Sequence, residues 1–309
     1  MVKSKPKSDK SAAPKGGQKA APKAAQKPAQ KRAPATANSA LGIDVGGTGV
    51  KAALVDVTTG ELLSRRHRVS TPKPSTPEAI AEAVKQIVGL IAAEIELPLE
   101  LPVGIGIPGA IKGGVVLEAP NLDKRWIGTN GEEVIGKALG GRRVVAINDA
   151  DAAGLAEVRY GAGRDVAGTV LMLTIGTGIG SGLFVNGRLV PNTELGHIEF
   201  RGRDAELLVS GLARERRHLR WHAWANEFSA FLARIERYLW PDLIILGGGV
   251  SKELKKYQRW LVAKAPIVPA QFLNTAGIVG AALYATDRLR AESARPSQPV
   301  AAKRRRTAS

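Results

Sequence analysis

The sequence predicts an α/β protein built from two similar domains that face each other across a cleft. Apolar stretches of strand length alternate with longer stretches whose apolar residues recur at helical spacing, as is typical of α/β proteins. One pattern also occurs twice, as DVGGTGVKAALV at 44–55 and TIGTGIGSGLFV at 174–185. Each copy is an apolar strand, a Gly/Thr turn and a second apolar strand, which indicates two halves built on one plan.

The first half of the chain is expected to form a sheet covered by a long helix. Its expected strands are at 41–45, 51–57, 61–69, 103–107 and 143–147. The helix is expected within 75–95, where Thr76 is a suitable N-cap and Pro77 occupies the first helical position. We therefore assign 39–147 to an N-terminal domain.

The second half is expected to repeat this alternation of strands and helices. Its expected strands are at 169–175, 182–185 and 242–246, and its expected helices are at 149–159, 221–239 and 275–290. We assign 148–274 to a C-terminal domain. The closing helical segment, 275–292, is expected to complete the N-terminal domain.

The composition excludes several kinds of site. The chain has 309 residues, 44% of them hydrophobic, and it contains no cysteine and four histidines. The missing cysteines exclude disulfides, iron–sulfur clusters and thiolate zinc sites, and the few histidines argue against a multi-histidine metal centre. No apolar run approaches the roughly 18 residues that a membrane helix needs, and no apolar stretch follows the basic N-terminus. We expect a soluble, cytoplasmic protein without membrane contact.

The net charge of +17 is concentrated at the two ends of the chain. Residues 1–38 carry +9 and residues 295–309 carry +5, which leaves +3 for the middle. Both ends are rich in Lys, Ala, Pro and Ser, so we expect disordered basic tails. Such a tail either makes non-specific contact with a polyanion or merely improves solubility, and the sequence favours neither.

Three glycine-rich turns are candidate phosphate sites. Glycine lets the backbone approach a phosphate closely, and the N–H groups of a turn form a concave anion site. The first two turns are Gly46, Gly47 and Thr48, and Gly176, Thr177, Gly178 and Gly180; their matching positions favour phosphate binding over ordinary hairpins. A third turn, LGGGVS at 246–251, follows an apolar strand and is either a phosphate contact or a tight strand–helix turn. Asp44 could hold Mg²⁺ through water.

Two other segments resemble nucleotide motifs but depart from them. GEEVIGKA at 131–138 nearly matches the Walker P-loop, but Ala138 stands where Ser or Thr binds Mg²⁺. GTGIGSG at 176–182 lacks the glycine spacing of the dinucleotide fingerprint. Neither segment predicts a nucleotide site of those types.

Asp149 is the candidate general base. Asn148 and Asp149 follow the strand 143–147, and ligands usually bind at the C-terminal ends of strands in α/β sheets. Phosphorylation of a sugar hydroxyl needs a carboxylate that accepts the hydroxyl proton. The alternative is that one of the pair simply caps the helix at 149–159.

A polar cluster in NTELGHIEF, 192–200, suits a sugar better than a metal. Glu194, His197 and Glu199 lie within six positions, but the chain has no cysteine and only four histidines from which a zinc site could be completed. A carboxylate accepts from hydroxyls, and an imidazole both donates and accepts. The cluster is therefore a candidate sugar site.

These motifs, taken in order, resemble the ROK family of sugar kinases. They are DVGGT, GIPGAI at 106–111, PNL at 120–122, IND at 147–149, GTGIGSG, ELGH and LGGGVS. The resemblance covers about 39–290 and implies the duplicated actin/hexokinase-like, ribonuclease H-like fold. Within the family, NTELGHIEFRGRDAE and LNTAGIVGAAL look more like the branch of polyphosphate glucokinases.

The resemblance implies a role for each candidate residue. The sugar side would comprise Gly109, Asn121, Asn148, Asp149, Glu194, His197 and Glu206. The phosphoryl-donor side would comprise Asp44, Gly46, Gly47, Thr48, Thr177, Gly178, Gly247, Gly248 and Gly249. Asp149 would accept the proton of the 6-hydroxyl, and Glu206 replaces Glu199 in the expected site.

The resemblance also implies the cofactor and the substrates. The zinc motif that usually follows the ELGH histidine is absent, replaced by RGRDAE, so Mg²⁺ arriving with the donor is expected and zinc is not.

The expected reaction is phosphorylation of glucose by inorganic polyphosphate, with ATP open as a second donor. The alternatives are a strictly ATP-dependent hexose kinase and a sugar-responsive regulator. The regulator is disfavoured because residues 1–38 lack the periodicity of a helix-turn-helix. Family members are often dimeric, so a homodimer is compatible with the resemblance.

Overall fold

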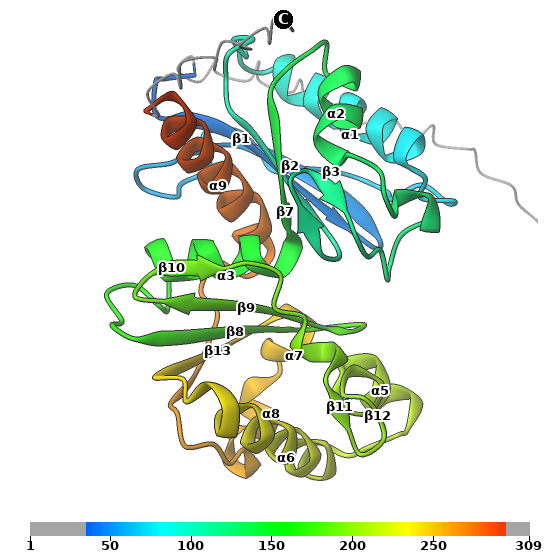
Figure 1. Cartoon of the computed structure of the whole chain (residues 1–309), viewed down its shortest axis with the longest axis vertical. Helices are drawn as coiled ribbons and strands as arrows, with labels where there is room; N and C mark the ends of the chain where they lie inside the picture. The colour runs from blue at the N-terminus through cyan, green and yellow to red at the C-terminus, as the bar shows by residue number, and fades with distance from the viewer. Residues whose placement is uncertain (1–34, 295–309) are drawn as a thin grey trace, which may run out of the picture. The chain divides into compact units, whose positions relative to one another are not determined.

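The computed structural model describes residues 35–294, and it contains two five-stranded sheets of the same design. The first sheet has the order β3-β2-β1-β4-β7 and the second the order β10-β9-β8-β13-β14. In each, the first three strands along the chain pair antiparallel and the last two join in parallel. The duplication that the repeated turn predicted is therefore confirmed at the level of the sheets (Figure 1).

The strands of the first sheet are β1 Ser39–Gly46, β2 Gly49–Asp56, β3 His67–Val69, β4 Val103–Ile107 and β7 Val144–Asn148. Four of the five agree with the predicted ranges to within a few residues, and the strand expected at 61–69 is shorter. Its first part is interrupted at Ser64, whose hydroxyl accepts from the backbone N–H of Leu54 and donates to the carbonyl of Arg65. A side chain thus replaces backbone pairing there, and regular pairing resumes at His67.

The second sheet consists of β8 Thr169–Ile175, β9 Ile179–Val185, β10 Arg188–Val190, β13 Leu243–Gly247 and β14 Ile267–Pro269. Strand β9 begins earlier than the predicted 182, because Ile175 pairs with Ile179 and only 176–178 remain in the turn. Smaller strands lie outside the sheets: β5 Ile111–Lys112 pairs with β6 Val115–Val116, and β11 Glu199–Phe200 with β12 Arg203–Asp204.

The α-helices of the described residues are α1 Pro77–Ala92, α2 Gly131–Ala138, α3 Asp149–Tyr160, α4 Glu206–Val209, α5 Gly211–Arg216, α6 Trp221–Leu239, α7 Gly248–Ser251, α8 Leu254–Tyr257 and α9 Ala276–Ser293. Short 3₁₀ turns occur at η1 Lys124–Trp126, η2 Leu195–His197, η3 Gln258–Trp260 and η4 Leu273–Thr275. Thr76 caps α1 by accepting from the N–H of Ala79, as predicted. The near-match to the P-loop, 131–138, is the helix α2 and not a loop.

Helices α3 and α9 pack against each other between the two sheets (Figure 1). Helix α9 covers β1 and β4 of the first sheet, while α3 covers β8 and β9 of the second. Side chains of α3, α9, β1, β2, β8 and β13 share one buried cluster. The helix that closes the chain therefore packs on the first sheet, but the predicted domain boundaries, 39–147 and 148–274, remain predictions.

Among residues 35–294, no helix is both long and apolar enough to cross a bilayer. The predicted basic tails, 1–38 and 295–309, lie almost wholly outside the described residues.

Candidate active site

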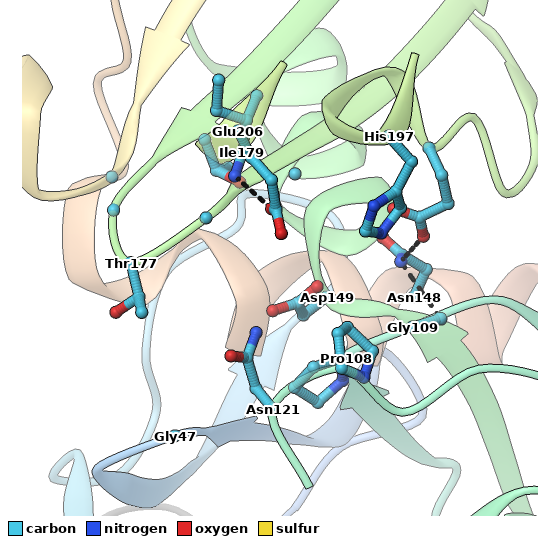
Figure 2. A pocket seen from close by; sticks show the side chains of 17 residues that line it. Gly47, Pro108, Gly109, Asn121, Asn148, Asp149, Thr177, Ile179, His197 and Glu206 are labelled. Carbon is cyan, nitrogen blue, oxygen red and sulfur yellow. Dashed lines mark hydrogen bonds between the residues drawn. The ribbon is translucent and has the colours of Figure 1, made fainter. Parts of the chain in front are cut away.

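A cavity of about 220 Å³ collects all of the residues predicted for the sugar side. Its lining includes Gly109, Asn121, Asn148, Asp149, Glu194, His197 and Glu206, which come from segments far apart in the sequence. Figure 2 shows Asp149 between Glu206 and Ile179 on one side and Asn121 on the other. We call this space the sugar cavity, after the substrate that the resemblance in the sequence predicts for it.

The junction of β7 and α3 places Asn148 and Asp149 at the floor of the sugar cavity. Asn148 is the N-cap of α3, and its side-chain oxygen accepts from the backbone N–H groups of Ala150 and Asp151. Its amide nitrogen donates to the carbonyl of Gly109 at 3.1 Å and to Glu194 Oε1 at 2.9 Å. The alternative that one of the pair caps the helix is thus realised by Asn148, and Asp149 remains available to a ligand.

The carboxyl of Asp149 is set up to accept a proton near neutral pH. Burial raises its pKa to about 7, and the negative charges of Asp44 and Glu194 add to this effect. A general base works best when its pKa lies near the working pH. Asp149 also opens onto the cavity, so the group with the shifted pKa is accessible to a substrate hydroxyl.

Glu194 and Glu206 present carboxylates to the sugar cavity. Burial raises the pKa of Glu194 despite the opposing charge of His197. Glu206, the first residue of α4, accepts from the backbone N–H of Ile179 at 3.1 Å (Figure 2). This bond ties α4 to the turn of the β8–β9 hairpin, so Glu206 belongs to the same wall as Thr177 and Gly178.

His197 lies at the end of η2 and is oriented by Asp204. Burial alone would lower the pKa of His197, but the hydrogen bond of its Nδ1 to Asp204 and the charges of Glu206 and Glu194 raise it. The contact to Asp204 leaves Nε2 as the ring atom for a ligand. Glu199 lies outside the cavity lining and accepts from the N–H of Gly202 in the β11–β12 hairpin.

Gly109 can only be glycine in this arrangement. Its φ is +113°, and an added Cβ would lie 1.9 Å from the carbonyl oxygen of Glu118. The carbonyl of Gly109 itself accepts from Asn148. The GIPGAI motif therefore brings the chain after β4 close enough to form one wall of the sugar cavity.

A second cavity of about 260 Å³ adjoins the first, and Asp149 is part of its lining as well. Asp44, Gly46, Gly247, Gly248 and Gly249 line it, as predicted for the donor side, and Asp149, Thr174 and Gly248 line both cavities. We call it the donor cavity. Gly248 has φ of +77° and lies against the backbone of Ile175, which explains the glycine at the start of α7.

The remaining donor-side predictions fall in two places. Gly47, Thr177 and Gly178 line the sugar cavity and not the donor cavity. Thr48 lines neither cavity; its carbonyl at the tip of the β1–β2 turn accepts from Arg68 at 2.6 Å.

Several residues of the donor cavity are additions to the predicted site. Lys51 pairs with Asp44 at 2.7 Å, and Lys252 lies near Asn274 Oδ1 at 3.4 Å; all four line the donor cavity. Lys51 could have been found from the sequence, because closing the hairpin between Gly46 and Gly49 places Asp44 opposite Lys51. Lys252 carries no comparable signal, since it follows a turn whose direction is set by tertiary packing.

The carboxylates of the donor cavity are compatible with a divalent ion whose other ligands are phosphate oxygens and water. Within 35–294 there is no cluster of three or more His, Asp or Glu side chains that could cage a metal. Asp44 offers one carboxylate in the donor cavity, and Mg²⁺ is commonly held by one or two carboxylates, water and substrate phosphates. The donor set is therefore suited to Mg²⁺ that arrives with a phosphorylated substrate.

Comparison with known proteins identifies the family. The ROK family model matches residues 40–210. The chain belongs to the ROK family. It is 45% identical to a polyphosphate glucokinase of Mycobacterium tuberculosis over 80% of this chain and 91% of that protein.

Two solved structures of ROK kinases resemble this chain. One is the inorganic polyphosphate/ATP-glucomannokinase of Arthrobacter sp. strain KM, with 49% identity, a TM-score of 0.78, and coverage of 81% of this chain and 99% of that one. The other is a ROK family glucokinase of Streptomyces griseus in complex with glucose and AMPPNP, with 28% identity, a TM-score of 0.68, and coverage of 81% and 99%. The expected actin/hexokinase-like fold of ROK sugar kinases is thereby confirmed.

Proposed function

We propose that this ROK protein is a glucokinase that transfers a phosphoryl group from inorganic polyphosphate to the 6-hydroxyl of glucose. The observation that carries the proposal is the position of Asp149, which lines the sugar cavity and the donor cavity together. In a phosphoryl transfer the acceptor hydroxyl must lie next to its base and, at the same time, next to the phosphorus of the donor. The 45–49% identity to polyphosphate-using kinases supports the choice of substrates.

In the proposed reaction, Asp149 accepts the proton of the 6-hydroxyl as its oxygen bonds to the terminal phosphorus. The bond between that phosphorus and the bridging oxygen breaks, and the shortened polyphosphate leaves with the electron pair. The sugar is held by Glu194, His197 and Glu206, whose acceptors and donors match ring hydroxyls. Asn148 supports this wall by bonding Glu194 and Gly109 together.

On the donor side, the backbone of the glycine turns lets phosphate oxygens approach closely. Lys51 and Lys252 add positive charge to the donor cavity, which suits a polyanionic chain. Mg²⁺ bound with the donor would offset the phosphate charge, and Asp44 is the carboxylate placed to approach it. The Asp44–Lys51 pair would also keep the carboxylate oriented before the donor binds.

ATP is a second candidate donor, favoured by a third cavity of about 500 Å³. This space adjoins the donor turns through Thr177 and Gly249, and Trp221 forms part of its wall. The Trp221 ring stacks on Tyr257 at 5.1 Å, and the guanidinium of Arg214 lies 3.9 Å from its centroid, so a cationic and aromatic wall borders the space. A nucleoside would fit there with its phosphates directed to the glycine turns.

The deciding experiment compares donors with purified protein, Mg²⁺ and glucose. Formation of glucose 6-phosphate from polyphosphate is expected, and mannose should be tested as the alternative acceptor. No sugar phosphate from either donor would overturn the proposal. Activity with ATP alone would assign the chain to the strictly ATP-dependent hexose kinases. A cytoplasmic location, a homodimer and contact between the tails and polyanions remain predictions.

A further inference from the structure

A side chain next to the sugar cavity imitates the pairing of two strands. Asn192 Nδ2 donates to the carbonyl of Ile111, and Asn192 Oδ1 accepts from the N–H of Ile111, both at 2.8 Å. Ile111 begins β5, a short strand after β4 of the first sheet, and Asn192 lies in the loop after β10 of the second. One amide group therefore ties together two segments that follow strands of different sheets.

Asn192 is itself oriented by a buried carboxylate. Its backbone lies in the left-handed region, with φ of +59°, and its N–H donates to Asp151 Oδ2 at 2.8 Å. Asp151 is 1% exposed, and its other oxygen, Oδ1, has no hydrogen-bond partner in the described part of the chain. A buried carboxyl with half of its bonding capacity unmet costs stability. Its one bond, to Asn192, is the contact that can offset this cost.

Both residues of the Asn192–Ile111 contact lie two positions from a residue that lines the sugar cavity. Gly109 lies two residues before Ile111, Glu194 lies two residues after Asn192, and both line the cavity. Asn148 bonds to that same pair, so two parallel ties hold one wall of the cavity.

The residues next to Asn192 are held as well. Ser181 donates to the carbonyl of Thr193 and accepts from the N–H of Leu195. Asp151, Asn192 and Ile111 themselves line neither the sugar cavity nor the donor cavity. The Asn192–Ile111 tie can therefore act on a substrate through Gly109 and Glu194, and Asp151 also contacts Asn148, whose side-chain oxygen accepts from its N–H.

We propose that Asp151, Asn192 and Ile111 form a latch that fixes Glu194 and Gly109 in place and so sets the affinity for the sugar without touching it. Asn192 and Asp151 are positioning residues of the sugar site. The inference rests on the proposed function for the identity of the sugar, although the geometry of the latch does not depend on the donor. It predicts a change in KM for glucose that is separate from KM for polyphosphate.

Asn192→Gly is the sharpest variant, because glycine keeps the left-handed backbone and the N–H that reaches Asp151. Only the two bonds to Ile111 are lost, and KM for glucose should rise roughly ten-fold or more, with KM for polyphosphate unchanged. Asn186→Gly is the matched control. Asn186 also has a positive φ, of +50°, and its side chain bonds the N–H of Gly168 in an exposed turn away from both cavities.

Asp151 offers a second test with its own rescue. Asp151→Ala removes the acceptor for Asn192 and should raise KM for glucose, whereas Asp151→Asn keeps an acceptor oxygen and should restore KM to within about three-fold of wild type. Glucose binding, measured by calorimetry without donor, should show the same order. A purely structural role would lower the melting temperature and the active fraction while leaving both KM values unchanged.

The latch and the proposed function can fail separately. If the wild type is active but Asn192→Gly binds glucose as tightly as wild type and Asn186→Gly, the latch is wrong. If the wild type phosphorylates no sugar, the proposed function is wrong, and calorimetry with glucose still tests the latch. Equal changes in the affinities for glucose and polyphosphate would also overturn the latch, because it touches the wall of only one cavity.

Discussion

The sugar cavity is lined by carboxylates and an imidazole that accept and donate hydrogen bonds, whereas the donor cavity presents two ammonium groups beside the glycine turn 247–249. Glu194, His197 and Glu206 supply the first set, and Lys51 and Lys252 stand out in the second. A neutral sugar has to be recognised by the direction of its hydroxyls, while a phosphate chain is held by charge and by close backbone approach. Substitutions on the two sides should therefore separate into effects on one substrate or the other.

Asp149→Asn should have the largest effect, because Asp149 lines both cavities. The amide cannot accept the hydroxyl proton, so kcat should fall about a hundred-fold or more while glucose still binds. Initial rates and calorimetry with glucose measure the two quantities. Asp287→Asn makes the same chemical change at an exposed residue paired with Arg159 and serves as the control. Near-normal kcat in Asp149→Asn would remove Asp149 from the role of base.

Lowering the pH should remove activity through the same group. The pKa of Asp149 is about 7, so the protonated, inactive form accumulates below that value. We expect kcat/KM for glucose to fall about ten-fold per pH unit well below pH 7. His197 also titrates with a raised pKa, so the profile must be repeated in His197→Ala. If the acid limb disappears in His197→Ala, it belongs to His197 and not to Asp149.

The next effect belongs to the sugar cavity alone. His197→Ala removes a ring that is oriented by Asp204, and KM for glucose should rise roughly ten-fold with KM for polyphosphate unchanged. The control is His222→Ala, since His222 lies on α6 beside Trp260 and lines neither cavity. Normal glucose affinity in His197→Ala would exclude His197 from sugar recognition.

The difference between the cavities also explains how much could be predicted from the sequence. The strands and the helix α3 follow from the periodicity of apolar residues. Asn148, Asp149, Glu194 and His197 stand out as polar residues at a strand end or in a short cluster, whereas Gly109, Asn121 and Glu206 follow only from the resemblance to the ROK family. Lys252 was missed because only tertiary packing brings it next to Asn274, which lies 22 positions further along the chain. Both residues then line the donor cavity. The hairpin β11–β12 was missed because each strand has only two residues, too few for a periodic pattern.

Asp151 shows a different limit of prediction from sequence. Its position in DADAAG suggests no more than a polar residue in the first turn of a helix. Its burial depends on the packing of α3 against α9 and β9, and its partner Asn192 lies 41 positions away. A hydrogen bond between a buried side chain and one distant backbone N–H produces no motif or regular spacing by which the sequence could reveal it.

The smallest expected effect belongs to the donor cavity. Lys252 is exposed, so solvent and salt weaken its attraction to phosphate, and Lys252→Ala should raise KM for polyphosphate only about three- to ten-fold. KM for glucose should not change. The increase should shrink as the salt concentration rises, because screening removes the same interaction in the wild type.

Lys255→Ala is the matched control, as Lys255 is exposed and near in sequence but lines neither cavity. An equal effect of both variants would show that polyphosphate responds to the general charge of this surface, and the distinction between the two cavities would then rest on the glycine turns and Asp44–Lys51 alone.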